Sequence, residues 1–194
     1  MPRPIRILYV GLAATDAHLA ATGRDRGRAL TKPLLMPVLM VNRDQPTQRA
    51  LALCGAGDIA LLGSSDTTFK LGLGSFLAGH LAWVAALRGR SSGHLKERPV
   101  LALPYVAAWI GLNAYLWRRT GRDRLPVVAY STALLATALA ALDTGDPATT
   151  AGGALFLTSD ALIALERFAD VHVPWHEGIV MLTYTAAQAL LAHT

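Results

Sequence analysis

Long apolar stretches that contain few charges are the feature that most constrains how this chain folds. Eight of them follow one another, at residues 5–21, 31–41, 50–62, 69–87, 100–117, 125–142, 148–165 and 179–192. Hydrophobic residues make up 53% of the chain and charged residues only 16%, which leaves too little polar surface to cover a water-soluble core. This composition excludes a disordered chain, a basic nucleic-acid-binding domain and a disulfide-stabilised secreted module.

The apolar stretches predict helices that cross a membrane. A chain in hydrocarbon satisfies its backbone hydrogen bonds within each segment or in a closed barrel, and these stretches lack the alternation of barrel strands. Five of them have 17 to 19 residues, close to the roughly 20 that cross about 30 Å of hydrocarbon. The stretches 31–41, 50–62 and 179–192 are shorter, and we expect them to span with the help of flanking residues. The expected fold is all-α, a multi-pass transmembrane helical bundle with eight spans that forms one integral membrane domain over residues 1–194.

Charged residues collect in short segments between the stretches, for example at residues 24–28. The formal net charge of +5 suits segments that lie beside anionic lipid headgroups. With eight spans, eight Lys and Arg residues fall on the face that carries both termini and ten on the other, so the positive-inside rule leaves the orientation open. Arg3 and Arg6 precede the first stretch as in a signal peptide, but Asp16 and His18 interrupt its apolar run, so we interpret it as a retained helix.

Polar side chains inside the apolar stretches carry the functional signal, because an ionisable group in hydrocarbon is costly unless it meets a partner in the bundle interior. These side chains are Asp16, Asp58, His80, Asn113, Tyr130, Asp160, Tyr184 and Gln188. Counting from the ends of the stretches places the three aspartates, Asn113 and Tyr130 in one layer, about 6–8 Å inside one face. Because Lys32 begins its stretch at the same face, we expect a polar pocket that opens there.

Asp58 and Asp160 are the candidate catalytic pair. Two carboxylates held close together in a low dielectric do not both ionise easily, so one can donate a proton while the other stays ionised. The alternative is a structural role, in which a carboxylate pairs with Lys32 and ties helices together. Asp16 has the same structural alternative, and His80 is also explained as an interior histidine whose hydrogen bonds are satisfied.

Metal binding has little support in the sequence. His172 and His176 are four residues apart, but Pro174 between them argues against a helix there. We find no nucleotide, flavin or metal motif, and we expect neither a metal nor a cofactor. The tryptophans lie mostly near the ends of stretches, where interfacial anchors are expected, at positions Trp83, Trp109, Trp117 and Trp175.

A series of short motifs runs in order along nearly the whole chain. They are Lys32-Pro33-Leu34, Gly57-Asp58, Phe69-x2-Gly72-x3-Phe76-x2-Gly79-His80, Pro126-x3-Tyr130, Gly153-Ala154-Leu155-Phe156-x2-Ser159-Asp160 and Tyr184-x3-Gln188. This ordered set resembles the YhhN-type lysoplasmalogenases, a family of multi-pass membrane proteins. Trp83 stands where that family often has a tyrosine, a departure that bears on the pocket rather than on the fold.

The resemblance implies hydrolysis of the vinyl ether bond of a lysoplasmalogen, a 1-alkenyl-glycerophosphoethanolamine or -choline, to a fatty aldehyde and a glycerophospho-base. It places the family's essential intramembrane aspartates at Asp58 and Asp160. A carboxylic acid can protonate the double bond to give an oxocarbenium ion, and a neighbouring carboxylate can stabilise that cation and deprotonate the capturing water. The sequence leaves open which of the two aspartates is the acid.

Further polar residues are expected to support the substrate. They are Lys32, His80, Tyr130, Tyr184, Gln188, Asn113 and Asp16. Lys32 would steer the substrate phosphate or hold one carboxylate ionised. His80, Tyr130 and Gln188 would orient water or the glycerol hydroxyl. The expected partner is a lysophospholipid within a bacterial plasma membrane, with no nucleic acid, and no protein partner is predicted.

Two other classes of protein remain open from the sequence alone. A proton-coupled or lipid transporter could use the same aspartates as a relay, although we find no inverted repeat of the kind that secondary transporters often have. A metal-dependent lipid amidase could be built from His80 and the two aspartates.

Overall fold

The computed structural model describes residues 2–193, which are all-helical and contain no strand. The long helices are α1 (Arg3–Ala21), α2 (Asp25–Met40), α3 (Gln45–Ala60), α4 (Asp66–Arg88), α6 (Leu103–Leu116), α7 (Arg124–Asp143), α8 (Pro147–Ala169) and α9 (His176–Leu191). A short helix α5 (His94–Glu97) and the 3-10 turns η1 (Pro99–Ala102) and η2 (Gly121–Asp123) lie between them. Each apolar stretch overlaps one long helix, so the all-α prediction is confirmed.

Four helices in the described chain are long and apolar enough to cross a membrane. They are α4, η1 continued by α6, η2 continued by α7, and α8. The prediction of eight spanning helices is therefore wrong. Helices α2, α3 and α9 have 16 residues each, so they extend about 24 Å, less than the roughly 30 Å of hydrocarbon. Helix α1 has 19 residues, but Arg3, Arg6 and Asp16 reduce its hydropathy.

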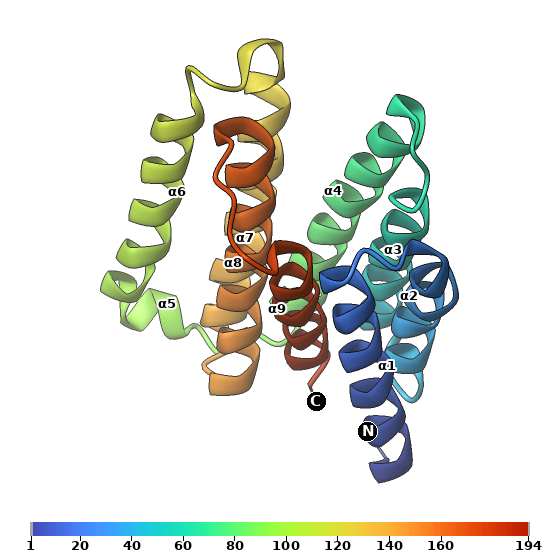
Figure 1. Cartoon of the computed structure of the whole chain (residues 1–194). Coiled ribbons are helices and arrows are strands. Elements are labelled where there is room, and N and C mark those ends of the chain that lie inside the picture. Colours follow the sequence, from blue (N-terminus) through green and yellow to red (C-terminus); the bar gives the residue numbers. More distant parts are fainter. Residues whose placement is uncertain (1, 194) are drawn as a thin grey trace.

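Seven of the long helices in the described residues form a closed ring. Around the ring the order is α1, α2, α3, α4, α7, α8 and α9, and α9 packs back against α1. Helix α6 lies outside the ring against α7 and α8, and of its residues only Leu116 is buried. The start of α1 and the end of α9 lie at the same end of the bundle, which we call the terminal end (Figure 1). The ring turns one side of seven helices toward a shared interior.

Helix α9 begins nearer the terminal end of the bundle than the point where α8 ends. After α8 the chain runs back beside that helix before α9 starts, and α9 then stands between α8 and α1 (Figure 1). Half of its 16 residues are buried, among them Tyr184 and Gln188. The short helix therefore contributes mainly interior contacts, which explains why its length falls short of a membrane span.

Close helix contacts at glycine fix the depth of the interior side chains. A methyl group on Gly79 of α4 would lie 2.7 Å from the sulfur of Cys54 on α3, one turn before Asp58. A methyl group on Gly152 of α8 would lie 2.8 Å from the backbone nitrogen of Leu191 on α9. Only glycine fits at these two crossings, and they set the registers of α3 with α4 and of α8 with α9.

The start of α8 is fixed by a side-chain cap outside the spanning segment. Asp146 accepts hydrogen bonds from the backbone N–H of Thr149, at 2.7 Å, and from the Thr149 hydroxyl, at 2.6 Å. These two hydrogen bonds favour the charged carboxylate and lower the pKa of Asp146. Because Asp160 lies 14 residues further along α8, this cap helps to set the helix that carries it.

Candidate functional site

Every helix of the ring contributes a polar side chain that is buried or half-buried. In chain order these side chains are Asp16, Lys32, Asp58, His80, Tyr130, Asp160 and Tyr184. Contacts join six of them into two groups, one around each of the candidate catalytic aspartates. The sequence places most of these residues in one layer, and the contacts described below bring them together across helices.

Asp58 on α3 is the centre of the first group. Its side chain is almost completely buried, and its Oδ1 lies 3.4 Å from the ammonium nitrogen of Lys32 on α2, which is itself only 8% exposed. The hydroxyl of Tyr184 on α9 donates a 2.7 Å hydrogen bond to Oδ2. Burial raises the pKa of Asp58 to about 6, and the Lys32 ammonium and the Tyr184 hydroxyl oppose that shift.

Asp160 on α8 is the centre of the second group. Its Oδ2 accepts a 2.7 Å hydrogen bond from the hydroxyl of Tyr130 on α7 and lies 3.6 Å from Nε2 of His80 on α4. The same Nε2 is 3.3 Å from the Tyr130 hydroxyl, and Nδ1 of His80 is 3.3 Å from the hydroxyl of Thr137. Unlike Asp58, this carboxyl has neither a lysine nor an arginine among these partners, and it keeps 10% of its side chain exposed.

Aromatic rings connect the two groups. Phe156 on α8 packs against Tyr184 at 5.6 Å between ring centroids and against His80 at 4.6 Å. The contacts therefore run from Asp58 through Tyr184, Phe156 and His80 to Asp160. The two carboxylates share one interior, but each is held by its own partners.

A second polar layer lies one helical turn nearer the terminal end. Gln188 follows Tyr184 by four residues on α9, and its Oε1 accepts a 3.1 Å hydrogen bond from Nε1 of Trp83, which follows His80 on α4. Both side chains are completely buried, so the prediction that Trp83 is an interfacial anchor is wrong. Within the described residues, Nε2 of Gln188 makes no hydrogen bond to an oxygen or nitrogen atom. The Gln188 side chain also lies against the buried thiol of Cys54 on α3.

Two of the predicted supporting residues take different places. Oδ1 of Asp16 accepts a 2.6 Å hydrogen bond from Thr31, the residue before Lys32, so Asp16 ties α1 to α2 beside the first group. Asn113 lies on α6, outside the ring, where it exchanges hydrogen bonds with Ser131 of α7. The structure therefore brings Asp16 close to the site and keeps Asn113 apart from it.

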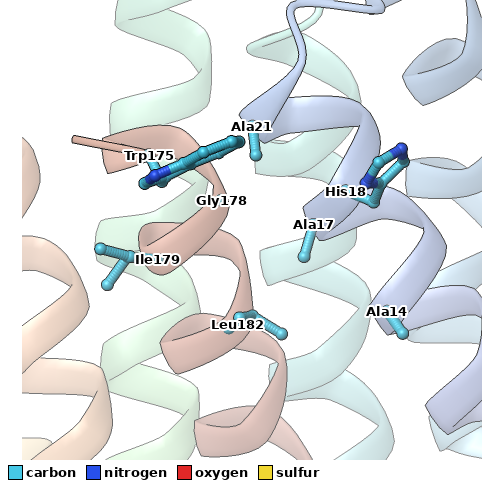
Figure 2. A pocket seen from close by; sticks show the side chains of 8 residues that line it. All are labelled: Ala14, Ala17, His18, Ala21, Trp175, Gly178, Ile179 and Leu182. Atoms are coloured by element: carbon cyan, nitrogen blue, oxygen red, sulfur yellow. The ribbon is translucent and has the colours of Figure 1, made fainter.

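An apolar hollow of about 310 Å³ lies between α1 and α9, away from both aspartates. Figure 2 shows Ala14, Ala17 and His18 on one side of it and Ile179 and Leu182 on the other, with Trp175 reaching toward Ala21 at one end. None of the residues that line this hollow is an aspartate or a glutamate. The predicted polar pocket therefore does not coincide with this hollow.

Metal-ligating side chains do not gather in the described part of the chain: no three His, Cys, Asp or Glu residues there are placed to hold one ion. The two histidines considered from the sequence instead face separate acids. His172 lies 3.6 Å from Asp170, and His176 lies 2.8 Å from Glu166.

A helical bundle with four candidate membrane spans and a buried acidic interior defines this chain as a multi-pass membrane protein. The sequence model of the YhhN family matches residues 27–194, and the chain belongs to that family.

Two curated relatives are each named lysoplasmalogenase. They come from Mycobacterium bovis (strain ATCC BAA-935 / AF2122/97) and Mycobacterium tuberculosis (strain CDC 1551 / Oshkosh). Each is 34% identical to this chain over 152 residues, which cover 73% of this chain and 57% of the relative. The chain thus spans little more than half the length of these relatives. No solved structure matches it.

Proposed function

We propose that this protein hydrolyses the vinyl ether bond of lysoplasmalogens and releases a fatty aldehyde and a glycerophospho-base. Membership of the YhhN family and the similarity to two proteins named lysoplasmalogenase support this assignment. The observation that carries it is the difference between the two aspartates. Asp58 is paired with Lys32, whereas Asp160 contacts a tyrosine and a histidine and is more exposed.

In the proposed mechanism Asp160 is the general acid. A vinyl ether is activated when its double bond takes up a proton at carbon, which leaves an oxocarbenium ion. Asp160 donates that proton, and the Tyr130 hydroxyl and the His80 imidazole orient its carboxyl group. A positioned general acid typically accelerates such a step by about 10²–10⁴-fold.

Asp58 has a different role, because Lys32 and the Tyr184 hydroxyl favour its ionised form and offset part of the opposing effect of burial. Its negative charge stabilises the developing oxocarbenium ion within a low-dielectric interior, where such an interaction is stronger than in water. Water then adds to the cation and gives its proton to the Asp160 carboxylate, which restores the acid. The resulting hemiacetal collapses to the aldehyde and the free glycerol hydroxyl, so the overall reaction consumes one water.

The second polar layer supplies a position for water. The Gln188 amide lies one turn nearer the terminal end than Tyr184, within the same interior. We propose that this amide orients the attacking water or the glycerol hydroxyl. We also propose that the protein is a single membrane domain that acts in the bacterial plasma membrane, since both curated relatives are mycobacterial.

Asp160→Asn tests the assignment directly, because it keeps the shape of the side chain and removes the acid. We expect this variant to remain folded and to lose aldehyde release from a 1-alkenyl lysophospholipid by at least about 100-fold. Asn113→Ala, on the helix outside the ring, should retain the activity. Aldehyde release by Asp160→Asn at the wild-type rate contradicts the mechanism. Proton or lipid flux in proteoliposomes without any aldehyde would favour a transporter instead.

A further inference from the structure

Arg28 has an unusual environment for a cation near the end of a membrane bundle. It lies in the first turn of α2, and its side chain is only 14% exposed. One terminal nitrogen of its guanidinium lies 2.7 Å from the Glu177 carboxylate of α9 and 3.8 Å from that of Asp25. Its Nε is buried and has no hydrogen-bond partner in the described structure. The guanidinium therefore has one N–H donor, at Nε, that is not used in a hydrogen bond.

Glu177 is a replaceable partner for this guanidinium. Its side chain is 60% exposed, so leaving Arg28 returns the carboxylate to solvent with little other change. The contact uses one nitrogen of Arg28, although a guanidinium binds an oxyanion best through two parallel N–H donors. A phosphate group has the oxygen spacing to accept from a terminal nitrogen and from Nε together.

The position of Arg28 fits the headgroup of the proposed substrate. Lys32 follows Arg28 by four residues on the same face of α2, about 6 Å along the helix axis, and it contacts Asp58. Arg28 is therefore one turn further from the terminal end than the acidic interior. In a lysophospholipid only the glycerol unit separates the phosphate from the ether bond. A phosphate on Arg28 would leave that bond at the depth of the two aspartates.

We propose that Arg28 binds the phosphate of the lysolipid headgroup and that Glu177 occupies this position until the substrate replaces it. The inference rests on the lysophospholipid substrate of the proposed function. Arg28 is a substrate-binding residue in this account, and Glu177 is an internal competitor that sets how readily the phosphate binds.

Binding of a saturated 1-alkyl lysophosphatidylcholine tests the proposal without any turnover, because this lipid has no vinyl ether to cleave. We expect Arg28→Gln to weaken its binding to the protein in nanodiscs by about 10- to 100-fold, as loss of a charge-assisted hydrogen bond predicts. Glu177→Gln should strengthen binding. Arg26→Gln removes the same charge from an exposed position in the same turn and should leave binding unchanged.

The opposite signs of the two variants separate ligand binding from a structural ion pair. A contact that only holds α2 to α9 predicts that Arg28→Gln and Glu177→Gln weaken binding alike, a result that would overturn the proposal. A 1-alkylglycerol, which lacks the phosphate, should bind equally to the wild type and to Arg28→Gln. Equal weakening of 1-alkylglycerol binding in Arg28→Gln would also overturn it.

Two soluble ligands distinguish the lipid from free phosphate. Glycerophosphocholine should compete with the 1-alkyl lipid in the wild type and compete poorly in Arg28→Gln, whereas inorganic phosphate should compete weakly in both. Stronger competition by inorganic phosphate than by glycerophosphocholine contradicts a lipid headgroup site. Aldehyde release is measured separately, so a protein that binds the 1-alkyl lipid through Arg28 but forms no aldehyde refutes the proposed function and leaves this site intact.

Discussion

The ion pair between Lys32 and Asp58 gives a prediction that separates structure from catalysis. The two charges are 3.4 Å apart and nearly fully buried, and at an effective dielectric constant of about 20 they attract by about 5 kcal/mol. Removing one partner leaves the other charge buried without a counter-ion, which typically costs about 3–5 kcal/mol. We therefore expect Lys32→Met to lower the free energy of unfolding in detergent micelles by that amount.

Removing both charges should restore much of the lost stability. In the double variant Lys32→Met with Asp58→Asn no buried charge is left unpaired, so the two losses are not additive. The proposed role of Asp58 predicts that this double variant folds but releases aldehyde at least about 100-fold more slowly than the wild type. A purely structural pair predicts that stability and aldehyde release recover together.

The exposed pair of Lys70 with Asp66 on α4 provides the matched control. Both side chains are more than 70% exposed, and Lys70→Met should change the free energy of unfolding by less than about 1 kcal/mol. Equal losses for the two lysine variants, or additive losses in the double variant, would refute the reasoning about the buried pair.

Three further predictions concern the elements that hold the site. Tyr130→Phe removes the hydroxyl that orients Asp160, and a fluorescent aldehyde assay should show about 10- to 100-fold slower release from a folded protein. Gly152→Ala forces a methyl group against the backbone of α9 and should cost about 1–3 kcal/mol in the same unfolding experiment, whereas Gly11→Ala, which meets nothing within 4 Å, should cost none. Asp146→Ala removes the cap of α8 and should cost about 1 kcal/mol at neutral pH. Because hydrogen bonds lower the pKa of Asp146 in the folded protein, this contribution should be present at neutral pH and fade as the pH falls below about 4.

The helices were predictable because long apolar runs leave the backbone few alternatives in hydrocarbon. Their role as spans was less predictable. An apolar stretch of 11 to 14 residues is also typical of a helix that is covered by protein. Helix α9 is such a helix, because half of its residues are buried. Length and burial together therefore decide whether a helix spans, and a sequence shows burial only indirectly.

For the site, the sequence indicates how deep each polar residue lies along its helix but not which helices it faces. Counting residues places Asp58, Asp160 and Tyr130 near one end, and Asp58 contacts Lys32, whose stretch begins at the same face. Depth alone could not show which helix lies outside the ring, so Asn113 was grouped with residues that it does not contact.

The pairing of Trp83 with Gln188 in the second polar layer escaped the sequence for a chemical reason. Trp83 lies near the end of an apolar stretch, where a tryptophan is usually interfacial, and its real partner Gln188 is more than 100 residues away. The spacing that could have revealed this layer is local: Trp83 follows His80 by three residues and Gln188 follows Tyr184 by four. Residues three or four positions apart lie on the same face of a helix, so Trp83 shares a face with His80 and Gln188 shares one with Tyr184.

Aldehyde release is the measurement that tests the central claim most directly. Purified protein in nanodiscs is incubated with a 1-alkenyl lysophospholipid or with its saturated 1-alkyl counterpart, for the wild type and for Asp160→Asn. The account predicts free fatty aldehyde only from the wild type with the alkenyl lipid, because only a vinyl ether can be activated by protonation at carbon. No aldehyde from the wild type, or equal aldehyde release by Asp160→Asn, would contradict it.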